Sequence, residues 1–266
     1  MNLGGRLAVV TGGGSGIGQE LVRQLAGHGC SVAFCDVRAN SLSETTALAR
    51  QGASAEVSVT GHVCDVADQS AVDSFRDNMI AEHATDHVDI LVNNAGMSGG
   101  ASFVAGRAER WERTFAVCWG GVYNCSRSFL PLLLASERAH LVNISSVNGF
   151  WARLGPGLTN SAYSTAKFAV KGFTEGLVED FRLHAPHVSV TLVMPGHVGT
   201  NIVPDEEFRA SAPTSAAEAA SDILLAIERE HWRVLIGNDA RRLDALVRAD
   251  PEGVYAPTGP NLFDLA

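Results

Sequence analysis

Short apolar runs alternate with helical segments along most of the chain, and this alternation constrains the fold more than any other feature. The runs occupy residues 7–10, 31–35, 56–63, 90–92, 141–144, 188–193 and 234–236. Strands that are buried on both faces read as continuous apolar runs, because helices cover each side of a parallel sheet. The sequence therefore predicts an α/β fold with a doubly wound, seven-stranded parallel sheet and helices on both faces.

The segments between these runs carry helix signals and no sign of a domain boundary. Residues 41–44 and 215–218 both read Ser-x-x-Glu, the pattern of a helix capping box. No internal repeat, low-complexity tract or linker divides the chain of 266 residues. We therefore predict a single domain over residues 1–266, with a substrate lid at about 201–213 and an irregular tail at about 250–266.

Charge and cysteine content exclude several classes of function. The formal net charge is -9, which argues against a nucleic-acid partner and against binding to an anionic membrane surface. No cysteine lies in a C-x-x-C pair or has the spacing of a zinc ligand, so we predict no metal site.

The N-terminal segment lacks the long apolar core of a signal peptide, and no stretch approaches membrane-spanning length. We therefore expect a cytoplasmic protein with reduced thiols.

A glycine-rich turn follows the first apolar run and precedes a helical segment. Residues 11–18 read Thr-Gly-Gly-Gly-Ser-Gly-Ile-Gly. Glycines at this position let the backbone approach a pyrophosphate, which the N–H groups and the dipole of the helix N-terminus hold. The absence of a lysine after the glycines excludes a P-loop, and the serine lacks the G-x-S-x-G pattern of a nucleophile elbow. The predicted dinucleotide contacts in this turn are Gly12, Ser15, Gly16, Ile17 and Gly18.

Two carboxylates end the next two predicted strands. Asp36 is placed to accept hydrogen bonds from both hydroxyls of an adenosine ribose, and its charge would repel a 2′-phosphate, so NAD is favoured over NADP. Arg38 lies close enough to weaken that preference, and a turn-capping role for Asp36 is an alternative. Asp65 and Val66 are the next predicted cofactor contacts. Asp65 has the position to meet the adenine amino group, with a helix cap as the alternative.

Tyr163 and Lys167 lie four residues apart in a predicted helix, so their side chains share one helix face. A tyrosine phenol has a pKa of about 10, and bringing it near neutral requires about 4 kcal/mol of differential stabilisation of the phenolate. A nearby lysine ammonium would supply such stabilisation. A plain packing pair on a helix surface is the alternative interpretation of this spacing.

Five short motifs, in this order, resemble the short-chain dehydrogenase/reductase family of the single-domain type over about residues 5–240. They are T-G-x-x-x-G-x-G at 11–18, N-N-A-G at 93–96, N-I-S-S at 143–146, Y-x-x-x-K at 163–167 and M-P-G-x-V-x-T at 194–200. The resemblance implies a Rossmann fold and hydride transfer between a nicotinamide cofactor and a carbinol carbon. It also implies Tyr163 as base in oxidation and acid in reduction. Ser146 would hold the substrate oxygen, since it matches the family's position better than Ser145 does.

The other cofactor contacts implied by the resemblance come from two loops and from Lys167, which would bind the nicotinamide ribose. The loop after the fourth strand would pack beside the adenosine ribose and contribute Asn93, Ala95 and Gly96. The loop after the sixth strand would meet the nicotinamide and the phosphates and contribute Pro195, Gly196, Val198 and Thr200.

In two places the sequence departs from the family's pattern. Cys118 stands where the family has an asparagine that kinks a long helix and supports a water on the proton's path to solvent, which predicts slower or differently pH-dependent turnover. The interval between Ser146 and Tyr163 is longer than usual. Phe150 and Trp151 within it either wall an apolar substrate pocket or pack against a neighbouring subunit. The candidate substrate contacts are Ser146, Asn148, Phe150, Trp151 and His197, with a solvated loop position as the alternative for the histidine.

An aromatic series runs along one predicted helix at steps of four residues. Its members are Trp111, Phe115, Trp119 and Tyr123. Packing on the sheet is the plain interpretation of such a stripe. In the family this helix and the helix that carries the tyrosine form a four-helix dimer contact, so we expect a homodimer or homotetramer.

We therefore predict an oxidoreductase that prefers NAD and acts on a small secondary alcohol or ketone of partly apolar character. One alternative is an NADP-dependent carbonyl reductase, which Arg38 favours. The other is a non-catalytic Rossmann scaffold that binds nucleotide and regulates a partner, which Cys118 favours.

Overall fold

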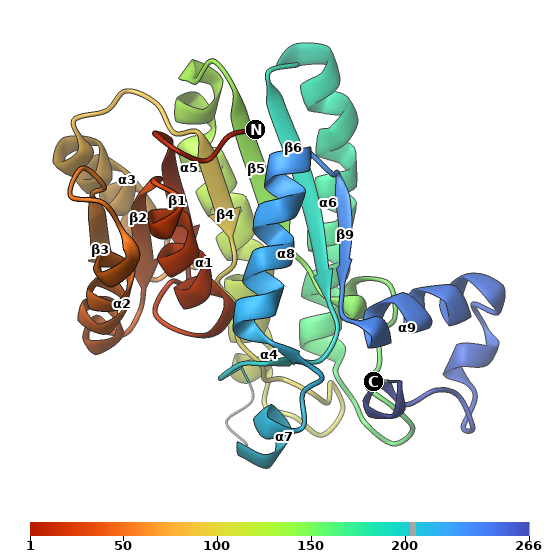
Figure 1. Ribbon diagram of the computed structural model, residues 1–266. Helices are drawn as coiled ribbons and strands as arrows, with labels where there is room; N and C mark the ends of the chain where they lie inside the picture. The colour runs from red at the N-terminus through yellow and green to blue at the C-terminus, as the bar shows by residue number, and fades with distance from the viewer. Residues whose placement is uncertain (203–205, 266) are drawn as a thin grey trace.

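The protein folds around a seven-stranded parallel sheet (Figure 1), so the prediction from the alternating apolar runs is confirmed. This computed structural model describes residues 1–202 and 206–265. The strand order across the sheet is β3-β2-β1-β4-β5-β6-β9. The strands are β1 (Leu7–Thr11), β2 (Ser31–Asp36), β3 (Val59–Val63), β4 (Ile90–Asn93), β5 (Ala139–Ile144), β6 (Val188–Pro195) and β9 (Arg233–Ile236).

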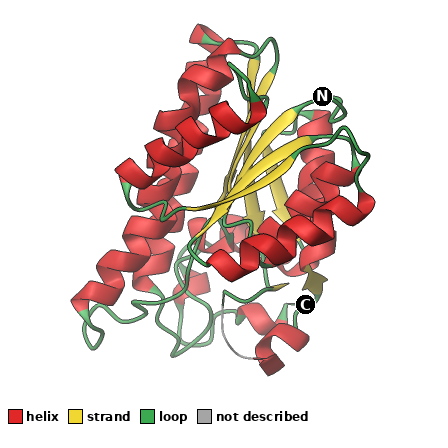
Figure 2. Ribbon diagram, turned by 90° about the vertical axis from the view of Figure 1, so that its left-hand side faces the viewer, coloured by secondary structure: helices red, strands yellow, loops and turns green. Residues whose placement is uncertain are grey.

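Helices cover both faces of the sheet, as Figure 2 shows. Helices α1, α2 and α8 pack on one face, and α3, α5 and α6 pack on the other. The helices are α1 (Gly16–Gly27), α2 (Ala39–Gly52), α3 (Gln69–His83), α4 (Ala108–Phe115), α5 (Gly121–Ala135), α6 (Ser161–His184), α7 (Glu206–Ala210), α8 (Ala216–Arg229) and α9 (Asn238–Ala249). A small second sheet, which the sequence did not predict, pairs β7 (Val198–Gly199) with β8 (Thr214–Ser215). No helix within the described ranges is long and apolar enough to cross a membrane.

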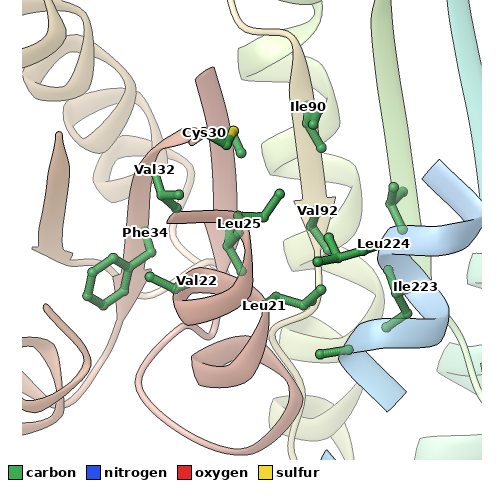
Figure 3. Packing of buried hydrophobic residues seen from close by; sticks show 14 of the residues in the cluster. Leu21, Val22, Leu25, Cys30, Val32, Phe34, Ile90, Val92, Ile223 and Leu224 are labelled. Carbon is green, nitrogen blue, oxygen red and sulfur yellow. The ribbon is translucent and has the colours of Figure 1, made fainter. Parts of the chain in front are cut away.

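Side chains alternate along β1 and so divide the apolar core into two clusters. Ala8 and Val10 pack into one cluster, and Leu7 and Val9 pack into the other. Figure 3 shows the first cluster, in which α1 and α8 meet over β4. Leu21 of α1 is fully buried there. Burial of one such leucine stabilises the fold by about 1.5–3 kcal/mol.

The C-terminal segment, predicted as an irregular tail at about 250–266, packs onto the chain itself. Its regular structure within the described residues is limited to two 3-10 turns, Gly253–Tyr255 and Leu262–Asp264. Val254 and Leu262 are buried with Trp151 in a third apolar cluster. Burial of these spaced apolar residues offsets the entropy lost on ordering the segment. Ala266 lies outside the described residues.

The strand order reverses at β1, whose neighbours are β2 on one side and β4 on the other. Doubly wound sheets open a ligand crevice at such a point, beyond the carboxyl ends of the strands. That edge lies at the bottom of Figure 1, where α4, α7 and the C-terminal segment gather. The glycine-rich turn after β1 and the loop after β4 both end there, so the fold brings the predicted motifs to one edge.

Candidate active site

A cavity of about 510 Å³ opens at this edge of the sheet. Its volume lies in the range of about 300–1,000 Å³ that is usual for cofactor and ligand sites. The predicted site residues that line it are Gly12, Ser15, Ile17, Asp36, Asp65, Val66, Ala95, Gly96, Ser146, Tyr163, Lys167, Pro195, Gly196, Val198 and Thr200. The structure therefore brings residues from both halves of the sheet around one space.

The glycine-rich turn forms part of the wall of this cavity. Gly12 has a φ of 66°, and a Cβ there would lie 2.8 Å from the Cα of Ala95. Gly18 does not line the cavity, but a Cβ there would lie 2.1 Å from the carbonyl oxygen of Gly12. Only glycine fits both positions. Ser15 is the N-cap of α1 and makes no side-chain cap bond, so the first amides of α1 are left for a ligand.

The carboxylate of Asp36 ends β2 beside the glycine-rich turn. One oxygen accepts a hydrogen bond from the Gly14 amide at 3.1 Å, and the other accepts from the Arg38 amide at 3.1 Å. The Arg38 guanidinium donates to the Ser15 hydroxyl at 2.9 Å and lies 3.4 Å from the Asp36 carboxylate. Asp36 thus braces the turn as well as lining the cavity. This placement is compatible with both the ribose contact and the turn-capping role that the sequence left open.

Asp65 has two partners that together explain its orientation. The Ala67 amide donates to one carboxylate oxygen at 3.0 Å, which is the turn-capping role. The Arg113 guanidinium lies 2.8 Å from the other oxygen. Arg113 comes from α4 and lines the cavity, as Arg110 one turn earlier does. The sequence interpretation missed these two arginines, whose spacing of three on a helix after the N-N-A-G motif was the available signal.

Tyr163, Ser146 and Lys167 meet at the other end of the cavity. Helix α6 begins at Ser161, so Tyr163 lies in its first turn. Ser146 and Tyr163 line the cavity together, and the Ser146 hydroxyl accepts a hydrogen bond from the Asn148 amide at 3.1 Å. The Lys167 ammonium lies 5.4 Å from the centre of the Tyr163 ring. It donates to the Ile144 carbonyl at 2.7 Å, which fixes the position of the buried ammonium.

The acidity of Tyr163 differs from what the sequence led us to expect. Burial raises the pKa of the Tyr163 phenol above its ordinary value, the nearby Cys118 thiol raises it further, and the hydrogen bond with Ser146 lowers it. Burial also lowers the pKa of Lys167. In this structure desolvation therefore outweighs the lowering that we expected from the lysine charge. Tyr163 keeps part of its surface open to the cavity, so desolvation acts less strongly on it than on a wholly enclosed phenol.

Cys118 lies in a π-helical turn, Ala116–Gly120, that joins α4 to α5. Its sulfur accepts a hydrogen bond from the Met97 amide at 3.4 Å and donates to the Met97 carbonyl at 3.3 Å. A Cβ placed on Gly96 would lie 3.8 Å from this sulfur and 3.9 Å from the Lys167 nitrogen. Cys118 therefore fastens the loop after β4 to the helix directly beside the lysine.

Two predicted asparagines hold the framework and do not line the cavity. Asn93 donates to the Ser126 hydroxyl at 2.9 Å and to Asn143 at 2.8 Å within the core. Asn148 donates to the carbonyls of Trp151 and Arg153, at 2.9 and 3.0 Å. The Asn93 and Asn148 amide nitrogens thus bond to protein partners, the Asn93 side-chain oxygen is buried without a partner, and neither residue lines the cavity.

The aromatic residues of the long interval do not line the cavity either. Trp151 is fully buried in the third apolar cluster, and Phe150 packs against the same cluster. His197 is also buried, with its amide bonded to the Asp239 carboxylate and its ring edge-on to Phe263 at 5.4 Å. The structure thus places these three away from the cavity and against the chain's own C-terminal part. Trp151 and His197 are buried within the chain, whereas Phe150 is half-buried.

The mouth of the cavity is formed by residues after the N-N-A-G motif and by the start of the predicted lid. The Ser98 hydroxyl donates to the Ile202 carbonyl at 2.6 Å, and Arg209 donates to Asn201 at 2.7 Å. Met97 joins Ser98 and Ile202 in the lining. Residues 203–205 of the lid predicted at 201–213 lie outside the described residues. In the part of the chain that is described, no group of His, Cys, Asp and Glu side chains is arranged to hold a metal ion.

Comparisons with known proteins agree with this geometry. A family model described as short chain dehydrogenase matches residues 6–209. The oxidoreductase SadH of Mycobacterium tuberculosis is 35% identical over 258 residues, which are 92% of this chain and 90% of that protein. The crystal structure of a short-chain dehydrogenase/reductase from Burkholderia phymatum, in complex with NAD, has a TM-score of 0.85 at 27% identity and covers 98% of this chain and 99% of its own. A metagenomic short-chain oxidoreductase in complex with NADP has a TM-score of 0.71 at 29% identity, covering 89% of this chain and 98% of its own.

Proposed function

The chain belongs to the short-chain dehydrogenase family, and on this basis we propose that it transfers a hydride between NAD and a secondary alcohol or ketone of partly apolar character. The observation that carries the proposal is that Ser146, Tyr163 and Lys167 line the same cavity as the glycine-rich turn. A proton donor and an oxygen-binding hydroxyl then stand where a substrate would meet the reactive end of a dinucleotide.

The residues present fit a nicotinamide dinucleotide. The free amides at the start of α1 would hold the pyrophosphate, and Asp36 would accept from the adenosine ribose. Gly12 leaves room for close backbone approach, since any side chain there would strike Ala95. When bound, the cofactor would supply or accept the hydride at the carbinol carbon.

The chain's own residues would handle the proton and the substrate oxygen. The Ser146 hydroxyl would orient that oxygen toward the Tyr163 phenol, which gives the proton in reduction and takes it in oxidation. The Asn148 amide donates to the Ser146 oxygen and so fixes the direction of its hydroxyl hydrogen. Lys167, held by the Ile144 carbonyl, would place positive charge beside the phenolate form.

Cofactor and substrate preference rest on the two ends of the cavity. The Asp36 carboxylate supports a preference for NAD, because it would repel a 2′-phosphate. Met97 and Ile202 present apolar surface at the mouth, and Ser98 presents a hydroxyl beside them. This mixture supports a substrate that is apolar in part. Met97 and Ile202 thus take the role of apolar wall that the sequence suggested for Trp151, which does not reach the cavity.

A panel of secondary alcohols and ketones, followed by the absorbance of reduced nicotinamide, tests the proposal. We expect turnover with NAD, and we expect Tyr163→Phe to reduce kcat by about 10²–10⁴-fold, because it removes the proton donor. NADH binding, measured by fluorescence titration, should stay within about twofold of the wild-type protein. Turnover that survives Tyr163→Phe would contradict the proposed mechanism.

A non-catalytic, nucleotide-binding role is the second candidate function, and Cys118 favours it, because its thiol lies beside Lys167 where the family has an asparagine. It predicts NADH binding without turnover across the entire panel. Cys118→Asn distinguishes the two, since restoring the family's residue should then create activity where none existed. Turnover in the unmodified protein would rule this candidate out.

A further inference from the structure

Three cysteine thiols lie together beneath the adenine end of the cavity, and the proposed function uses none of them. Cys35 lies in β2, Cys64 directly follows β3, and Cys125 lies in α5. All three are free, buried, and part of the same apolar cluster. The other two cysteines lie apart, because Cys30 belongs to the cluster on the opposite face and Cys118 lies beside Lys167.

Strand register brings Cys35 and Cys64 to the same face of the sheet. Cys35 pairs with His62 across β2 and β3, and the Cys64 amide donates to the Asp36 carbonyl at 3.1 Å. Because side chains two residues apart share a face of the sheet, Cys64 lies on the face of His62 and hence on that of Cys35. Both thiols are buried in the same apolar cluster on that face. Two thiols on neighbouring chain segments are therefore packed into one part of the core.

The two thiols differ in access and in acidity. Cys64 lines the cavity, whereas Cys35 is enclosed by protein. The hydrogen bond from Cys35 lowers the pKa of Cys64, and the same bond together with burial raises the pKa of Cys35. A thiol of lowered pKa that lines the cavity, next to a second thiol that protein encloses, is the arrangement of an attacking and a resolving cysteine.

We propose that Cys64 and Cys35 form a peroxide-sensitive thiol pair that controls binding at the adenine end of the cavity. The Cys64 thiolate attacks one oxygen of hydrogen peroxide, the O–O bond breaks, and a sulfenic acid forms while hydroxide leaves and takes up a proton. The Cys35 sulfur then attacks the Cys64 sulfur, the S–S bond forms, and the sulfenic oxygen leaves as a second water with the Cys35 proton. Each sulfur gives up one electron, and the peroxide takes both.

The disulfide would act on the two carboxylates next to it. A disulfide needs an S–S distance of about 2.05 Å, so its formation draws the end of β2 toward the segment after β3. Asp36 directly follows Cys35, and Asp65 directly follows Cys64. Both carboxylates line the cavity, so the shift changes the adenosine end of the site. This effect on affinity rests on the proposed function, whereas formation of the disulfide does not.

Thiol counting and peptide mapping test the disulfide. Hydrogen peroxide should remove two of the five thiols, measured after denaturation, and digestion should give a Cys35–Cys64 cross-linked peptide that dithiothreitol releases. Cys35→Ser should abolish the cross-link. The matched control is Cys30→Ser, which removes another buried thiol and should keep it. Absence of a disulfide in the wild-type protein, or a disulfide that contains Cys125, would overturn the proposal whatever the folding of the variants.

NADH titration of the reduced and oxidised wild-type protein tests the control of binding. We expect oxidation to weaken NADH binding by about tenfold, which is about 1.4 kcal/mol, and dithiothreitol to restore it. Preincubation with NADH should also slow the loss of thiols, because the bound molecule covers Cys64. An unchanged affinity in the cross-linked protein would refute the control of binding. If the reduced protein does not bind NADH but peroxide still forms the disulfide, the result would contradict the proposed function and support the thiol pair alone.

Discussion

Asp36 and Arg38 would act in opposite directions on the proposed preference for NAD. The Asp36 carboxylate is 9% exposed and accepts a hydrogen bond from the Gly14 amide, while the Arg38 guanidinium contacts Asp36 and the Ser15 hydroxyl. The carboxylate neutralises part of the Arg38 charge that a 2′-phosphate would need. The proposed preference for NAD would therefore depend on a single residue that also supports the turn.

Replacing that carboxylate should shift selectivity. We expect Asp36→Ser to tighten NADPH binding by at least about tenfold, or about 1.4 kcal/mol, because Arg38 is released to meet the 2′-phosphate. Fluorescence titration with NADH and NADPH measures both affinities. Adding Arg38→Gln to the same variant should remove the gain. An unchanged ratio of the two affinities in Asp36→Ser would show that selectivity lies elsewhere.

His140 makes the stability of the fold depend on pH. It is fully buried in β5, bonded to the Thr191 hydroxyl at 2.7 Å, and burial lowers its pKa to about 4. Glu230 opposes this lowering, while Arg138 and the N-terminal ammonium add to it. An unfolded chain, with an ordinary histidine pKa of about 6.5, binds the proton first on acidification. The contribution of neutral His140 is therefore complete above about pH 6.5 and is lost as the pH falls toward 4.

We expect the free energy of unfolding to fall by about 2 kcal/mol between pH 7.5 and pH 5 from this residue alone. Urea denaturation at the two pH values measures it. His140→Gln, which keeps a polar partner for Thr191, should show a correspondingly smaller loss. The control is His28→Gln at an exposed histidine, whose pH dependence should match the wild-type protein. Equal losses in all three proteins would exclude His140 as the source.

At the scale of elements, the sequence predictions were correct where neighbouring residues decide the structure. They were wrong where contacts with distant parts of the chain decide it. The capping box at Ser215 is confirmed, since serine and glutamate bond reciprocally at the start of α8. The same pattern at Ser41 is wrong, because α2 begins at Ala39 and the serine hydroxyl donates to the Arg38 carbonyl inside the first turn. The pattern fixes a spacing, but packing of α2 on the sheet decides where the helix begins.

In the site too, local sequence signals were predictive and long-range contacts were not. The motif residues follow strands whose order is set by the apolar runs, so their convergence on one edge follows from the sequence. The burial of Trp151 and His197 depends on contacts with residues about 40 to 110 positions later in the chain, such as Asp239 and Leu262. The ion pair of Asp65 with Arg113 is likewise a long-range contact. No local pattern carries such contacts, which is why these residues were assigned to other surroundings.

The C-terminal segment is one element whose role can be tested by a single truncation of a side chain. Leu262 is 4% exposed, and its amide donates to the Leu154 carbonyl at 2.9 Å, so it anchors the interval between Ser146 and Tyr163. We expect Leu262→Ala to lower the free energy of unfolding by about 2–4 kcal/mol. KM for the alcohol should rise while kcat changes little, because the interval loosens but the proton donor stays in α6.

Denaturant unfolding and steady-state kinetics measure these two effects. Leu246→Ala is the matched control, since this leucine of α9 is 41% exposed and its truncation should change stability by less than about 1 kcal/mol. If both variants lost the same small free energy, the C-terminal segment would not be part of the core that supports the site.

At the scale of the whole molecule, the aromatic series of α4 and α5 lies toward α6 and the surface. Trp119 packs edge-on against Phe173 of α6 at 5.4 Å, and Tyr123 is 48% exposed. Phe168 of α6 is 41% exposed. The plain interpretation, packing on the sheet, is therefore not what the structure has. Exposed aromatic side chains on neighbouring helices are typical of a protein–protein interface.

We therefore predict that two copies of the chain associate through this aromatic surface. Tyr123→Arg should weaken association by about 2 kcal/mol or more, roughly 30-fold, because it removes a large aromatic contact and places a charge in the interface. Sedimentation at micromolar protein should then shift toward the monomer mass of 28.1 kDa. Trp232→Arg removes an aromatic residue of equal exposure, 48%, from the position just before β9 and adds the same charge, so it should leave the assembly intact. Wild-type protein that sediments as a monomer, or equal behaviour of the two variants, would contradict this surface as the interface.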